Sequence, residues 1–140
     1  MYQAVIDTNV LVAAMRSKLG ASYKLLKTLG HPSWRPNLTV AVLLEYESVL
    51  KRNCNEFGLT ELDVDELLDA ICSESGMHRL YFQWRPIASD PGDDFLLEAA
   101  IASRSDFIIT FNQRHFRESR SFGIECLTPQ ELLIPIGELP

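Results

Sequence analysis

The chain has 140 residues, of which 46% are hydrophobic and 23% charged. This length is sufficient for one domain with its own core, and the composition excludes a disordered protein. No apolar run is long enough to span a bilayer, and the N-terminus lacks the basic and then apolar order of a signal peptide. We therefore expect a cytoplasmic protein with no membrane partner.

The net charge of −6 argues at first against a nucleic-acid partner, because binding to a phosphate backbone uses clustered Lys and Arg. An acidic excess is also what a carboxylate-lined metal site produces, and a bound divalent ion reverses the local sign of charge. The net charge therefore does not decide whether the protein has a nucleic-acid partner. Cys54, Cys72 and Cys126 are odd in number and widely spaced, which argues against a disulfide framework or a zinc site.

Hydrophobic periodicity and turn residues divide the chain into alternating strands and helices. The first half of the chain is predicted to form a strand over 2–6, a helix from about 10 to 29 with a break near 20, a helix from 37 or 39 through 50, and a helix that begins at 60 and is closed at 76. The second half is predicted to form a strand over 78–84, a helix from 93 or 94 through 102, strands over 107–110 and 123–127, and a last helix that begins at 128. Pro36 and Asn37 predict a connecting segment. Thr60 has capping-box spacing to Asp63, and Thr128 precedes a proline in the first helical turn.

This alternation predicts an α/β fold with a mostly parallel sheet that helices cover on both faces. The sequence contains no repeat, low-complexity tract or linker. We therefore expect residues 1–140 to form a single domain.

Acidic residues follow the predicted strands, where ligands gather in open parallel sheets. Asp7 comes directly after the first strand, and the segment 90–94 (Asp-Pro-Gly-Asp-Asp) lies between a predicted strand and a helix start. Both Asp7 and Asp93 also have an ordinary alternative role, because aspartate commonly caps a helix. Each residue alone is ambiguous.

Glu45 lies inside a predicted helix, where Leu38, Val42 and Val49 share its face. An inward carboxylate is costly unless it is paired or coordinates a metal. The alternatives are partial exposure or a pair with an arginine. Taken together with Asp7 and Asp93, Glu45 predicts a site for Mg²⁺ or Mn²⁺, hard cations that take oxygen ligands from a few carboxylates and promote phosphodiester hydrolysis.

The blocks that carry these acids resemble the PIN-domain family, specifically the small prokaryotic PIN proteins that are toxins of toxin–antitoxin pairs. The matching blocks, in family order, are 5–10 (VIDTNV), 44–46 (LEY), 90–94 (DPGDD) through Ala99-Ala100, and 106–112 (DFIITFN). The resemblance implies a three-layer α/β/α sandwich, a Mg²⁺- or Mn²⁺-dependent ribonuclease acting on RNA, an antitoxin protein partner and a homodimer.

The resemblance also carries roles onto residues of this chain. Asp7, Glu45 and Asp93 take the metal-ligand and catalytic role, with Asp93 chosen by its offset to Ala100. Supporting roles fall to Thr8, Asn9, Asp90, Asp94, Thr110 and Asn112. Asp90 and Asp94 replace Asp93 if that register is wrong.

Asn112 departs from the family pattern, because many PIN domains have a fourth acidic residue there. An amide oxygen is a neutral ligand, which weakens the case for a second metal ion. The departure favours an alternative function, a catalytically weak PIN scaffold that binds RNA or a protein partner. A phosphatase acting on small phosphoesters is a third, weaker alternative.

Arginines offer a secondary signal for RNA. Arg85 and Arg114 are candidates for contact with substrate phosphates, although a solvated arginine is the ordinary interpretation of either one. Arginines also crowd the C-terminal third of the chain, scattered among acids (Arg104, Arg114, Arg117, Arg120). The three histidines lack metal-ligand spacing and are predicted to be structural or surface residues (His31, His78, His115). No glycine-rich phosphate loop or GxSxG motif occurs.

Overall fold

The structure of the chain is a computed structural model that describes residues 1–78 and 94–140. Its strands are β1 (Tyr2–Ile6), β2 (Trp34–Leu38), β3 (Gly76–Met77), β4 (Phe107–Ile109) and β5 (Glu125–Leu127). Its helices are α1 (Thr8–Arg16), α2 (Ala21–Lys27), α3 (Val40–Asn53), α4 (Glu61–Ser73), α5 (Asp94–Ala102), the 3₁₀ helix η2 (Gln113–Phe122) and α6 (Pro129–Leu133).

The five strands form one parallel sheet in the order β3-β2-β1-β4-β5. The chain first builds outward from β1 to β2 and β3, and then returns to the other side of β1 with β4 and β5. The order therefore reverses between β1 and β4, and in such sheets the ligand crevice lies at that switch point, beyond the carboxyl ends of the strands.

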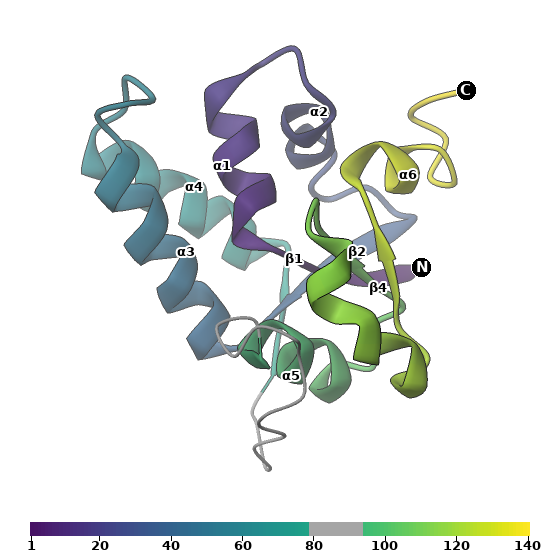
Figure 1. Cartoon of the computed structure of the whole chain (residues 1–140). Coiled ribbons are helices and arrows are strands. Elements are labelled where there is room, and N and C mark those ends of the chain that lie inside the picture. The colour runs from purple at the N-terminus through teal and green to yellow at the C-terminus, as the bar shows by residue number, and fades with distance from the viewer. Residues whose placement is uncertain (79–93) are drawn as a thin grey trace.

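Helices lie on both sides of this sheet, with α5 below it and α1, α2 and α6 above it (Figure 1). Helices α3 and α4 pack against each other beside α1. Three consecutive residues of β1 (Ala4, Val5 and Ile6) are at most 1% exposed, as expected for a strand buried on both faces. The predicted α/β/α architecture with a parallel sheet is confirmed. Within the described part of the chain, no helix combines the length and the apolar character needed to cross a bilayer.

The local start signals act as predicted at three helices. The Thr39 hydroxyl accepts a hydrogen bond from the Val42 amide at 3.3 Å and caps α3. At α4, the Thr60 hydroxyl accepts from the Asp63 amide at 3.1 Å, while the Asp63 carboxylate accepts from the Thr60 amide at 2.8 Å. A second reciprocal box at Thr128 begins α6.

The connection predicted at Pro36 and Asn37 is wrong, because both residues belong to strand β2. Pro36 lies opposite Ala4 in the β1–β2 register. Proline and asparagine are both uncommon in strands. Here Trp34 and Leu38, 2% and 1% exposed, bury the two ends of the segment in the core, and that burial outweighs the local preference.

The same correction changes the argument for Glu45. Leu38 lies in β2 and not in the helix, so it cannot share a helical face with Glu45. The buried face of α3 consists of Val42, Tyr46 and Leu50. Glu45 is half-buried at the edge of this face and is not part of its centre.

Two other predicted boundaries moved. Helix α4 ends at Ser73, and Gly76 belongs to β3 instead of closing the helix. The predicted strand 78–84 lies, apart from His78, outside the described residues, and so does the turn at 91–92. Residues 113–122, for which the sequence analysis predicts no element, form η2.

Candidate functional site

Asp7 lies at the carboxyl end of the central strand, at the point where the strand order reverses. It follows β1 directly and is the N-cap residue of α1. Its backbone amide donates to the Ile109 carbonyl at 2.9 Å, which ties the end of β1 to the end of β4. The residue is 6% exposed. A carboxylate is thereby held inside the protein at the predicted ligand crevice.

The strongest hydrogen bond of the Asp7 side chain comes from a residue outside its own helix. The side chain makes no capping hydrogen bond to α1. Instead, the Thr110 hydroxyl donates to Asp7 Oδ2 at 2.6 Å, and the same hydroxyl accepts from the Asn112 amide at 2.9 Å. Thr110 is fully buried. The orientation of the carboxylate is therefore set by the segment that follows β4.

Burial raises the pKa of Asp7 above its ordinary value. The Thr110 hydroxyl, the backbone amides of Asn9 and Thr8, and the charge of His115 act in the opposite direction and do not fully offset burial. The carboxylate therefore occupies a position where its negative charge is costly. A bound cation relieves that cost, because an opposite charge within a few ångströms favours the ionised form.

Two further oxygens beside Asp7 lack partners. Thr8 Oγ1 and Asn9 Oδ1 are buried and find no hydrogen-bond partner among residues 1–78 and 94–140. A buried polar atom without a partner is costly and is uncommon in folded proteins. Hard divalent cations and their water ligands seek carboxylate, hydroxyl and amide oxygens. The donor set around Asp7 therefore fits Mg²⁺ or Mn²⁺.

Tyr46 joins helix α3 to this edge of the sheet. It is 1% exposed, and its hydroxyl donates a short hydrogen bond to the Ile6 carbonyl, immediately before Asp7. Burial and, second, the negative charge of Asp7 raise the pKa of Tyr46 far above its ordinary value. Tyr46 therefore lies close to the carboxylate, and Glu45 is the residue that precedes it on α3.

A family model that describes the PIN domain matches residues 3–114. The chain belongs to the PIN-domain family. No curated protein matches the sequence. PIN domains are generally nucleases, which hydrolyse phosphodiester bonds. The matched range includes both strands that meet at Asp7 and extends through Asn112.

The site residues predicted for this PIN domain fall into three groups. The ends of β1 and β4 bring together Asp7, Thr8, Asn9, Thr110 and Asn112. Glu45 lies on α3, next to Tyr46, and Arg114 lies on η2. Asp94 is the first residue of α5, whereas Arg85, Asp90 and Asp93 lie outside the described residues. Within the described ranges no group of three His, Cys, Asp or Glu side chains is placed to hold a metal ion.

Three residues near the site were not predicted to take part in it. Tyr46 has no distinguishing local signal, because an aromatic residue on a helix is usually core. Glu98 is completely buried on α5, and its charge within an apolar run is a signal that sequence reasoning can use. His115 was predicted to be structural or at the surface, yet its charge acts on Asp7.

His115 also lines a cavity of about 380 Å³ together with Asn112, Arg114 and Glu131. Asn112 itself is exposed, and its backbone amide binds Thr110 as described above. The cavity therefore begins at the residue that replaces the family's fourth acid. It provides room for a polar ligand beside the segment that follows Thr110.

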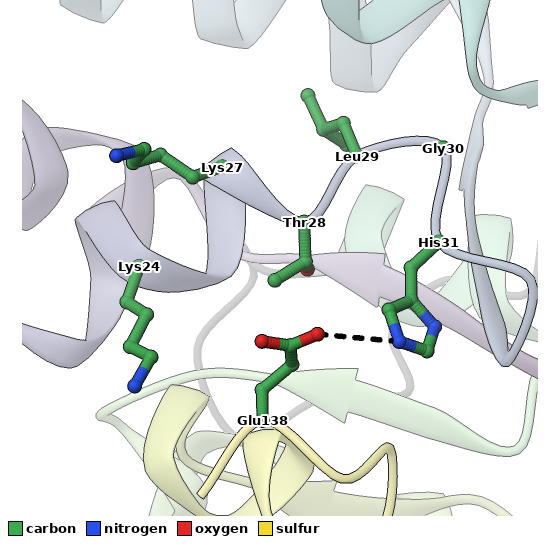
Figure 2. Close-up of a pocket in the computed structure, with 7 residues that line it drawn as sticks. All are labelled: Lys24, Lys27, Thr28, Leu29, Gly30, His31 and Glu138. Carbon is green, nitrogen blue, oxygen red and sulfur yellow. Dashed lines mark ion pairs between the residues drawn. The ribbon is translucent and has the colours of Figure 1, made fainter.

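A different cavity, of about 520 Å³, lies between α2 and the C-terminal tail (Figure 2). His31 and Glu138 point toward each other there, with His31 Nε2 3.4 Å from Glu138 Oε1, while Lys24 and Lys27 extend away from that pair. Among the described residues, Glu138 is the one carboxylate in its lining. This cavity has the composition of a surface ion pair and lacks the oxygen ligands of a hard-cation site.

Proposed function

We propose that this PIN domain is a divalent-metal-dependent endoribonuclease, with the cation held by Asp7, Glu45 and Asp93. One observation carries the proposal: a buried carboxylate at the switch point of the sheet makes no capping hydrogen bond to its own helix and is fixed by Thr110. A buried carboxylate lowers the stability of the fold, and such a loss is common where a residue serves function, here as a ligand of the metal ion.

The residues around Asp7 support distinct roles. Thr110 holds one carboxylate oxygen of Asp7 by a 2.6 Å hydrogen bond and so fixes the orientation of the ligand. Thr8 and Asn9 contribute buried oxygens that can hold water in the inner or outer shell of the cation. Tyr46 fixes α3, and with it Glu45, against the end of β1. When bound, the divalent ion supplies Lewis-acid activation for hydrolysis of the RNA phosphodiester.

RNA cleavage by the purified protein tests the proposal. Wild-type protein should cleave RNA internally when Mn²⁺ or Mg²⁺ is added and should stop when EDTA removes the ion. Asp7→Asn keeps the shape and an acceptor oxygen for Thr110 but removes the charge. We expect cleavage to fall about 100-fold or more, since changes even in residues that support metal ligands cost about 10- to 100-fold.

Asp69→Asn is the matched control, because Asp69 is an exposed residue of α4 and the chemical change is the same. Its cleavage rate should equal that of the wild type. Equal metal-dependent cleavage by wild type and Asp7→Asn contradicts the assigned site. Absence of cleavage in every variant, with RNA binding retained, supports the catalytically weak scaffold, which the neutral side chain of Asn112 favours.

The biological setting is a further part of the proposal. We infer a cytoplasmic toxin that acts as a homodimer and is neutralised by an antitoxin protein, on the basis of the resemblance to small prokaryotic PIN toxins. Growth arrest on expression of the wild-type chain, and normal growth on expression of Asp7→Asn, is the expected result. Equal growth with both proteins contradicts the toxin role without affecting the nuclease assay.

A further inference from the structure

Helix η2 separates a buried row of residues from an exposed row of arginines. Phe116 and Ser119 are each 1% exposed and three positions apart. Arg114, Arg117 and Arg120, also three apart, are exposed. In a 3₁₀ helix, residues three positions apart lie above one another. One row therefore anchors η2 to the core, and the other presents three guanidinium groups to solvent.

The helical repeat alone does not align all three arginines, because η2 is kinked at Phe116, where φ is −121° and ψ is 33°. The surface itself shows that they face the same way. All three line one cavity of about 430 Å³, together with Gln113, Ser119 and Cys126. We call Arg114, Arg117 and Arg120 the arginine row.

The arginine row stands out in a chain that has 19 acidic and only 13 basic residues. Two basic residues elsewhere are paired with acids: Arg16 lies 3.1 Å from Glu56, and Lys51 lies 2.8 Å from Asp65. In the part of the chain that the structure describes, no guanidinium of the arginine row has an ion pair or a hydrogen bond. Arg52 is also exposed without such a pair, so the shared cavity is what distinguishes the row.

The acid nearest to the start of η2 is already engaged with other groups. Glu131 Oε1 accepts from the Thr128 amide at 3.0 Å and from Gln113 Nε2 at 3.4 Å. The Glu131 carboxylate therefore completes the cap of α6 and holds the first residue of η2. The arginine row is left with its charge open to an external anion.

The arginine row is continuous with the candidate active site. Gln113 and Arg114 line both the 430 Å³ cavity and the 380 Å³ cavity that contains Asn112 and His115. The charge of His115 in turn favours the ionised form of Asp7. A path of basic side chains therefore begins at His115, whose charge acts on Asp7, and continues along η2.

We propose that the arginine row binds successive backbone phosphates of a single-stranded RNA whose scissile bond lies at Asp7. The proposal rests on the nuclease function and deepens it by assigning the path of the substrate. Arg117 and Arg120 lie on the same side of the kink and are one 3₁₀ turn apart, about 6 Å along the axis, so each can contact a different phosphate. Guanidinium groups match phosphate oxygens with two parallel hydrogen bonds.

A long anion fits this arrangement, because successive phosphates of one strand can each contact a different guanidinium group of the row. Backbone contacts fix position without selecting sequence. The row therefore supplies affinity and register, while the carboxylates select the bond that is cleaved. It also explains how an acidic protein can hold an RNA, since the positive charge is gathered where the strand runs.

Binding of a fluorescein-labelled single-stranded 12-nucleotide RNA, measured by anisotropy in EDTA, tests the proposal without interference from cleavage. The full-length Arg117→Gln/Arg120→Gln variant should bind about tenfold more weakly than wild type at low salt. The slope of log K against log salt should fall by about 1.4, since each contact to a single strand contributes about 0.7. Thermal melting checks that these exposed substitutions leave the fold intact.

Lys18→Gln/Arg52→Gln is the matched control, because it removes two exposed positive charges outside both cavities. Its affinity and salt slope should equal those of the wild type. Equal weakening by both double variants contradicts the arginine row, because net charge alone would then explain binding.

Cleavage separates this proposal from the nuclease function on which it rests. Loss of binding in the Arg117→Gln/Arg120→Gln variant, with no metal-dependent cleavage by wild type, supports the arginine row and overturns the nuclease. If wild type cleaves RNA, the variant should show a raised KM and a nearly unchanged kcat. An unchanged KM overturns the arginine row and leaves the nuclease standing.

Discussion

Helices α1 and α6 both begin directly after a strand at the same edge of the sheet, each behind a residue type that commonly caps helices. At α6, the Thr128 hydroxyl accepts from the Glu131 amide at 3.2 Å and serves its own helix. At α1, the Asp7 side chain makes no cap and binds Thr110 of another strand. A residue that gives up its local role for a buried and costly position marks a functional site.

Among substitutions at the Asp7 site, Thr110→Val has the largest expected effect on the free energy of unfolding. Valine keeps the shape but removes the hydroxyl that donates to Asp7 and accepts from Asn112. The free energy of unfolding should fall by about 2 kcal/mol, because hydrogen bonds to charged groups contribute about 1.5–3 kcal/mol. Urea denaturation in EDTA measures the change.

Thr8→Val is the control for that measurement, since Thr8 is a buried threonine next to Asp7 whose hydroxyl oxygen has no hydrogen-bond partner among the described residues. Its free energy of unfolding should not fall, because Thr8 Oγ1 has no hydrogen bond to lose. If both valine variants lose the same stability, the hydroxyl of Thr110 does not hold Asp7 as the geometry indicates.

Asp7→Asn and Thr128→Ala should move stability in opposite directions. Asparagine removes a buried charge and keeps an acceptor for Thr110, so the free energy of unfolding should rise by about 1 kcal/mol without metal, as is common when a costly functional group is replaced. Thr128→Ala removes a working cap and should lower it by about 1 kcal/mol. A loss in both variants would show that Asp7 acts as an ordinary cap.

The smallest expected effect concerns how the stability of the protein changes at low pH. Hydrogen bonding to the Thr128 backbone lowers the pKa of Glu131 below its ordinary value of 4.5. Because the folded-state pKa is depressed, the stabilisation is present above pH 4.5 and disappears as the pH falls through the lowered pKa. Glu131→Gln should therefore cost about 0.3 kcal/mol near pH 7, given the exposure of the side chain, and nothing near pH 2.

Urea denaturation of both proteins at the two pH values checks this prediction. A difference between wild type and Glu131→Gln that persists unchanged at pH 2 would show that the glutamine fails for a reason other than its charge.

Most helices and β1, β4 and β5 were predictable because their signals are local. Thr60 and Asp63 cap α4 across three residues, and the apolar run of β1 is continuous. Strand β2 was missed because its stabilising partners are distant in sequence. Asn37 is 2% exposed, yet its amide nitrogen donates to Gln3 Oε1 at 2.9 Å and its oxygen lies 2.9 Å from His78 Nε2. Those two bonds satisfy a side chain that otherwise disfavours a buried strand.

In the candidate site, too, some features can be predicted from the sequence and others depend on the tertiary structure. The position of Asp7 directly after the first strand follows from residue order alone, because the end of a hydrophobic run marks the end of the strand. The direction of its carboxylate does not, since Thr110 lies 103 residues away along the chain. The position of Tyr46 beside Asp7 likewise depends on how α3 packs against the sheet.

The sequence also shows several arginines in the C-terminal third of the chain, but there they are scattered among acidic residues. Only the packing of Phe116 and Ser119 into the core turns Arg114, Arg117 and Arg120 toward one cavity. Periodicity, caps and apolar runs act between neighbours, so the sequence carries them in readable form. Contacts between the ends of β1 and β4, and the choice of which side of η2 meets solvent, depend on which elements become neighbours in space, and that is decided by burial of the whole core.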